Sequence, residues 1–143
     1  MISIKMGLLI SLAATAAFAE PLPLNPQVTE KNIAETICLP GWTKTVRPPA
    51  SYTNAIKRQR VLDLGLPLEL IADFQLDHTI PLSLGGAPSD PRNLALMDLD
   101  DAEAKDRVER CLPHAVCEGR VPLSVAQRAI WEDWRAAAAL CGP

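Results

Sequence analysis

Four cysteines constrain the fold of this chain most, because all of them follow a segment typical of export signals. Residues 1–19 contain a single lysine, an apolar run from Met6 to Phe18 and a small-residue cleavage site, Ala17-Phe18-Ala19. A run this short does not span a bilayer, which takes about 20 apolar residues. We therefore expect a signal peptide at 1–19 and a periplasmic or secreted protein with no membrane association after cleavage.

An even number of cysteines in an exported chain predicts two disulfide bonds. The four residues, Cys38, Cys111, Cys117 and Cys141, allow three pairings. A zinc site is the alternative, although the spacings lack the C-x2-C pattern of structural zinc sites. We favour a bond between Cys38 and Cys117, which would tie the segment before Trp42 to the end of a predicted third helix.

The mature chain of 124 residues is long enough for one domain with a modest core. Three prolines predict an extended lead-in at 20–28, so the domain is expected at 29–143. Loss of Lys5 leaves 13 basic and 17 acidic residues, and a net charge of −4 does not favour nucleic-acid binding. The charges are segregated, however, with basic residues at 44–60 and acidic ones at 98–109, and the local field decides whether phosphate binds.

Helical spacing of apolar residues and typical capping residues together predict four helices. They are expected at 30–37 after Thr29, at 52–64 between Ser51 and Gly65, from Asp100 or Asp101 through 112, and at 125–140 after a capping box formed by Ser124 and Gln127. In the segment 38–49, a Pro-Gly turn and a closing Pro-Pro exclude a regular helix and favour an extended chain. Short apolar runs separated by Pro, Gly, Ser and Asp predict two strands around a loop within 74–97.

The first predicted strand ends with two chemically useful side chains, Asp77 and His78, and Asn93 follows fifteen positions after the histidine. A hard cation such as Mg²⁺ binds oxygen ligands, which Asp77 and an acid on the next helix could supply. A neutral imidazole beside the ion could take a proton from water and direct hydroxide at a phosphodiester. The Asn93 amide could accept from one ring nitrogen and fix the tautomer, or it could simply cap a turn.

The stretches "DHTIPLSLGG" (77–86) and "DPRNLALM" (90–97) resemble the first two thirds of the signature of the HNH endonuclease family. Its fold is a two-stranded ribbon packed on a helix around one metal ion. Further stretches, "ICLPGWTKTVRPPASYTNAIKRQ", "AKDRVE" and "AQRAIWEDW", resemble a group of exported bacterial HNH-like proteins. The resemblance implies an α+β fold with a small ββα-metal core, flanking helices and disulfide staples. It also implies that Asp77 is a metal ligand, His78 the general base, and Asn93 the brace of the base and its loop.

The third signature position departs from the family, because Ala102 stands where a histidine or asparagine is usual. Asp101, Glu103 and Asp106 are the available substitutes. Asp106 shares the helix face of Ala102, and Glu103 has the longer reach. We therefore expect Asp77, Asp106 and Glu103 to hold a divalent ion, and carboxylate ligands favour Mg²⁺ or Mn²⁺.

These residues predict a metal-dependent endonuclease that hydrolyses phosphodiester bonds of nucleic acid, DNA more than RNA. Candidate phosphate contacts are Lys57, Arg58, Arg60 and Lys105, although a basic run can be only a solvated face, and Lys105 can equally pair with neighbouring acids. The alternatives are an exported binding or structural protein on a degenerate HNH scaffold, and a non-catalytic metal-binding protein. An acid facing Asp77 and His78 would favour the enzyme, whereas Ala102 alone would favour a binding protein.

Overall fold

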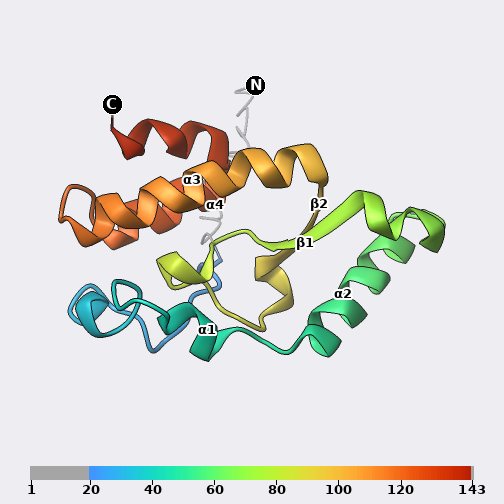
Figure 1. The fold of residues 1–143 in the computed structure, drawn as a ribbon, viewed down its shortest axis with the longest axis horizontal. Helices are drawn as coiled ribbons and strands as arrows, with labels where there is room; N and C mark the ends of the chain where they lie inside the picture. The colour runs from blue at the N-terminus through green and yellow to red at the C-terminus, as the bar shows by residue number, and fades with distance from the viewer. Residues whose placement is uncertain (1–19, 143) are drawn as a thin grey trace, which may run out of the picture.

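The computed structural model describes residues 20–142, so the predicted signal peptide lies outside the described residues. The chain is a mixed α+β protein in which a two-stranded hairpin lies between two helices (Figure 1). Its main elements are α1 (Trp42–Val46), α2 (Ala50–Asp63), β1 (Phe74–His78), β2 (Leu94–Asp98), α3 (Leu99–Cys117) and α4 (Leu123–Ala137). Five short 3₁₀ turns accompany them: η1 (Ile33–Glu35), η2 (Leu68–Asp73), η3 (Leu82–Leu84), η4 (Pro91–Asn93) and η5 (Ala138–Cys141). No helix among residues 20–142 is long and apolar enough to cross a membrane.

The two predicted strands are confirmed as an antiparallel pair, β1 with β2. Their register sets Phe74 opposite Asp98 and His78 opposite Leu94. The connecting loop folds back tightly where Gly86 lies against the chain: a Cβ at this position would sit 1.8 Å from the carbonyl oxygen of Ile80. Only glycine fits such an approach, so Gly86 allows the loop to fold back onto Ile80.

The prediction of a helix at 30–37 is wrong, because this segment forms turns around the 3₁₀ turn η1. The side chain of Asn32 accounts for the difference. Its Oδ1 accepts from the amide of Thr29 at 2.8 Å, and its Nδ2 donates to the carbonyl of Gln27 at 2.9 Å. An asparagine that bonds the local backbone in this way competes with helix formation.

The extended segment expected at 38–49 is also wrong, because it contains the helix α1. Gly41 precedes this helix in the left-handed region, at φ 84°, and the turn redirects the chain into Trp42. The helix ends after one turn because the residue before a proline disfavours helical geometry. Arg47, which precedes Pro48, is accordingly extended, with ψ 127°.

The three longer helices are confirmed, but the side-chain caps predicted for α2 and α4 are not. Pro49 precedes α2 in place of Ser51, and the side chain of Asp98 caps α3 by accepting from the Asp101 amide at 2.9 Å. The capping box of α4 does not form, because the Ser124 amide and the Gln127 side chain, which would bond each other in the box, bond distant residues instead. The Ser124 amide donates to Glu30, and the Gln127 side chain donates to the carbonyl of Leu84.

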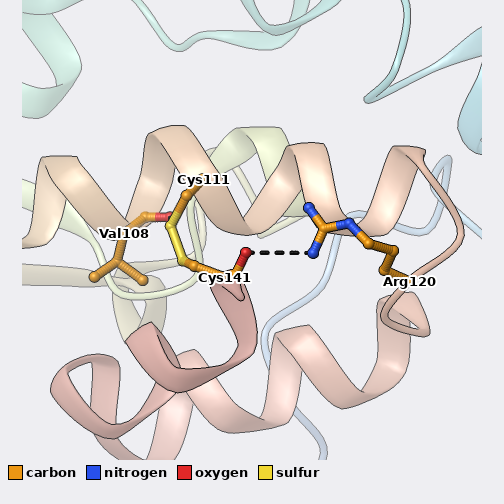
Figure 2. The surroundings of a disulfide bond; sticks show 4 residues. All are labelled: Val108, Cys111, Arg120 and Cys141. Atoms are coloured by element: carbon orange, nitrogen blue, oxygen red, sulfur yellow. Dashed lines mark hydrogen bonds between the residues drawn. A yellow bond between two sulfur atoms is a disulfide. The ribbon is translucent and has the colours of Figure 1, made fainter. Parts of the chain in front are cut away.

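The core lies mainly between α3, α4 and the loop that follows β1, and two disulfide bonds close it. The favoured pairing of Cys38 with Cys117 is confirmed, and Cys111 pairs with Cys141. Figure 2 shows the second bond, with the guanidinium of Arg120 donating to the carbonyl of Cys141 at 3.3 Å. Both bonds end on the last two turns of α3, which anchors the N-terminal segment and the C-terminus alike.

Candidate functional site

His78 is the last residue of β1 and its ring is held in one orientation. Nε2 lies 2.9 Å from the carbonyl oxygen of Pro88, in the loop between the strands. A carbonyl oxygen only accepts hydrogen bonds, so Nε2 must carry the proton. In a neutral ring, Nδ1 is then the nitrogen with a free lone pair, which is the requirement for a base.

The surroundings of His78 favour the neutral imidazole. Burial lowers the pKa of His78 below its usual 6.5, and the positive charges of Arg47 and Lys105 lower it further. The hydrogen bond to Pro88 and the nearby charge of Asp77 act in the opposite direction without outweighing burial. The ring is therefore neutral at pH 7, and it keeps its proton-accepting nitrogen.

A buried lysine faces Asp77 from the neighbouring helix. Lys105 on α3 is 1% exposed, and its ammonium lies 2.7 Å from Asp77 Oδ2 and 2.8 Å from the carbonyl oxygen of His78. It also donates to the carboxylate of Glu109, one turn along the same helix. All three ammonium hydrogens thus have oxygen acceptors, as a buried charge requires.

Glu109 shares this lysine with Asp77, and its pKa is raised. Burial is the largest cause that raises the pKa of Glu109 to about 7, and the charge of Asp77 adds to it. Lys105 acts against the rise but does not cancel it. One lysine thus balances two carboxylates, and the cluster carries a net charge of −1 when both are ionised.

Asn93 braces the loop beside the histidine rather than its ring. Its side chain is fully buried, and Oδ1 accepts from the amide of Ile80 at 2.8 Å. Nδ2 donates to the carbonyls of Ile80 at 2.9 Å and Ala87 at 3.0 Å. The expected contact with the ring is made by the Pro88 carbonyl instead. Asn93 holds the residue next to Pro88 and acts on His78 through the loop.

A cavity of about 280 Å³ opens beside the end of the hairpin. Asp77 and His78 line it from β1, Thr53 from α2, and Arg47 from the segment between α1 and α2. The cavity therefore combines a neutral imidazole with a guanidinium. Such a pair suits an anion that is to be attacked by water.

The predicted metal ligands do not converge on one point. The side chain of Glu103 is 80% exposed and its nearest charged partner is Arg107, at 3.7 Å. Asp106 is half-buried, and Asp77 already accepts from the ammonium of Lys105. Among residues 20–142, no group of three or more His, Cys, Asp or Glu side chains is arranged to hold a metal ion. Because the ammonium of Lys105 already pairs with Asp77, these residues do not fit a divalent ion at the expected place.

Three of the predicted nucleic-acid contacts lie on α2, and the fourth, Lys105, is buried on α3. Arg58 is exposed and Lys57 half-buried on α2, and Arg60 donates to the carbonyl of Pro91 at 2.9 Å. Lys105 differs from them, because it is buried among acids and does not reach the surface. Lys105 was expected either to contact phosphate or to pair with neighbouring acids, and in the structure it pairs with Asp77 and Glu109.

Sequence reasoning missed Arg47, the Pro88 carbonyl and Glu109 as parts of this site. A signal for the buried pair was present: Lys105 and Glu109 are four residues apart and continue the face of Ala102 and Leu112, which are both buried. Charged residues within an otherwise apolar helix stripe indicate a buried ion pair. Nothing comparable marks Pro88, since a backbone carbonyl has no sequence signature.

No family model, curated protein or solved structure matches this chain. The likeness to HNH endonucleases therefore rests on the quoted motifs.

Proposed function

We propose that this chain is an exported nuclease that hydrolyses phosphodiester bonds, with His78 as its general base. The observation that supports this most directly is the bond from Nε2 to the Pro88 carbonyl, which leaves Nδ1 free to accept a proton. The lowered pKa of His78 keeps the ring neutral at neutral pH. A catalytic base needs both properties.

The proposed reaction uses the groups that line the cavity. Nδ1 of His78 takes a proton from water, the water oxygen attacks phosphorus, and the bond from phosphorus to the leaving sugar oxygen breaks. That oxygen takes a proton from solvent. The guanidinium of Arg47, which lines the same cavity, balances the negative charge of the phosphate. Because the residues around Asp77 do not fit a divalent ion, no step here uses one.

The test is nicking of supercoiled plasmid by the oxidised mature protein, with EDTA and with Mg²⁺, Mn²⁺, Ni²⁺ or Zn²⁺ in turn. His78→Ala should lose about 100-fold or more in rate, the typical contribution of a positioned base. The matched control is His114→Ala, since His114 is the other histidine of the chain and is exposed on α3. Circular dichroism checks that both variants fold. Equal nicking by His78→Ala and the native protein would refute the assignment.

A second function, nucleic-acid binding without cleavage, is favoured by one observation. Ala102 stands at the third signature position, and the group facing Asp77 is a lysine rather than an acid. A binding protein would shift DNA in a gel without nicking it under any of these conditions. Its affinity would fall in Arg58→Ala, which removes an exposed positive charge, and would not change in His78→Ala.

A further inference from the structure

We propose that the ammonium of Lys105 is the resident cation of this site. In this proposal it occupies an oxygen cage that would otherwise bind a divalent ion, so the native protein takes no metal at Asp77. Which cation balances the charge of Asp77 does not depend on nuclease activity, because the same geometry would serve an enzyme or a binding protein.

Three oxygens surround the ammonium: Asp77 Oδ2 at 2.7 Å, the carbonyl oxygen of His78 at 2.8 Å, and a carboxylate oxygen of Glu109. Two carboxylates and a backbone carbonyl are the ligand types that Ca²⁺ and Mn²⁺ use. Ca²⁺ binds oxygen at about 2.3–2.6 Å, so Asp77 Oδ2 and the His78 carbonyl oxygen would need to move inward by only a few tenths of an ångström.

Lys105 is buried, and its side chain and that of Asp77 are only 2% and 14% exposed, so water screens this pair weakly. A divalent ion on Asp77 Oδ2 would have to lie beside the ammonium, because both would contact the same oxygen. Two cations at that separation repel each other strongly where water is scarce. The lysine therefore excludes the ion for as long as it stays in the cage.

Lys105 also fixes the reactive end of β1. Its ammonium joins the Asp77 carboxylate to the backbone carbonyl of His78, and both bonds come from α3. Lys105 is thus a positioning residue: it fixes the end of the strand that carries the imidazole without reaching the cavity itself. A purely structural lysine would do this too, and only the metal-binding behaviour separates the two roles.

Titration with Mn²⁺ in the absence of nucleic acid, followed by the EPR signal of free Mn²⁺, tests the proposal. The native protein and Asp77→Asn should give the same titration curve. Lys105→Ala should gain one Mn²⁺ per chain, bound at least tenfold more tightly than by the native protein. Adding Asp77→Asn to Lys105→Ala should abolish the gain. The matched control is Lys44→Ala, which removes the same charge from an exposed position on α1 and should gain nothing.

Two results would overturn the proposal. One is a stoichiometric Mn²⁺ site in the native protein that Asp77→Asn removes, and the other is a folded Lys105→Ala that gains no site. If circular dichroism shows that Lys105→Ala does not fold without metal, saturating Mn²⁺ should restore its fold, because an ion that binds only the folded chain stabilises it, and a variant that stays unfolded with Mn²⁺ would likewise overturn the proposal. Failure of the nicking assay leaves these readings unchanged, because they contain no nucleic acid.

Discussion

Replacing Asn93 with alanine should destabilise the protein more than any other single loss of a polar side chain around the loop. Three hydrogen bonds would be lost, one from the Ile80 amide and two to the Ile80 and Ala87 carbonyls. Asn93 and Ile80 are both fully buried, so water would not readily replace the lost partners. At about 1 kcal/mol for each bond, with a further penalty for buried groups left without partners, Asn93→Ala should cost about 4 kcal/mol.

Urea denaturation of the oxidised mature protein, followed by tryptophan fluorescence, measures this loss. Asn25→Ala is the matched control: Asn25 is also buried, but its side chain accepts a single bond, from the amide of Gln27. It should cost about 1 kcal/mol. If Asn93→Ala lowers the free energy of unfolding no more than Asn25→Ala does, then the brace does not hold the loop as described.

Three further predictions concern stability. The pKa of Glu109 is raised from 4.5 to about 7, so in this pH range the folded state keeps a proton that the unfolded state releases. The free energy of unfolding should therefore fall by up to about 3 kcal/mol as the pH rises from 4.5 to about 7. Glu109→Gln should flatten that part of a urea-denaturation pH profile, and an unchanged slope would contradict the assignment. Gly86→Ala should express poorly or unfold at a much lower temperature, because its Cβ would overlap the Ile80 carbonyl; a melting temperature within a few degrees of native would show that the loop adapts. Removing the Cys38–Cys117 bond should cost about 1 kcal/mol more than removing Cys111–Cys141, since it closes a span of 79 residues rather than 30; equal losses in denaturation of the two double-serine variants would contradict the loop-entropy account.

The strands and longer helices could be predicted from the sequence because their signals are local. Gly and Pro separate the two apolar runs of the hairpin, and helical spacing marks α3 and α4. The errors arise where distant contacts decide. Ser124 and Gln127 have the spacing of a capping box, yet Glu30 and the Leu84 carbonyl take both groups. A local pattern carries no information about such partners.

The candidate site was predictable to the same extent. The adjacency of Asp77 and His78, and the spacing to Asn93, are visible in the sequence, and the structure places His78 and Asn93 at the two ends of one loop, which each of them contacts by a hydrogen bond. The ligand set expected on α3 depended on which way each helix residue faces. Glu103 faces solvent, whereas Lys105 turns inward. The position of Lys105 and Glu109 on the buried face of Ala102 and Leu112 indicates a buried pair, but it does not identify Asp77 and the His78 carbonyl as further partners of the lysine.

The two disulfide bonds also determine what happens when the backbone is cut. Cys38 and Cys117 enclose the hairpin, its loop and α2 within one covalent ring. A protease that cleaves once anywhere in 39–110 therefore opens the ring without releasing a fragment. Under oxidising conditions the nicked molecule still migrates as a single species, and two bands appear only after reduction. A cut in an exposed loop therefore leaves the two pieces joined by the disulfide, and the bond keeps their effective concentration high enough for them to stay associated.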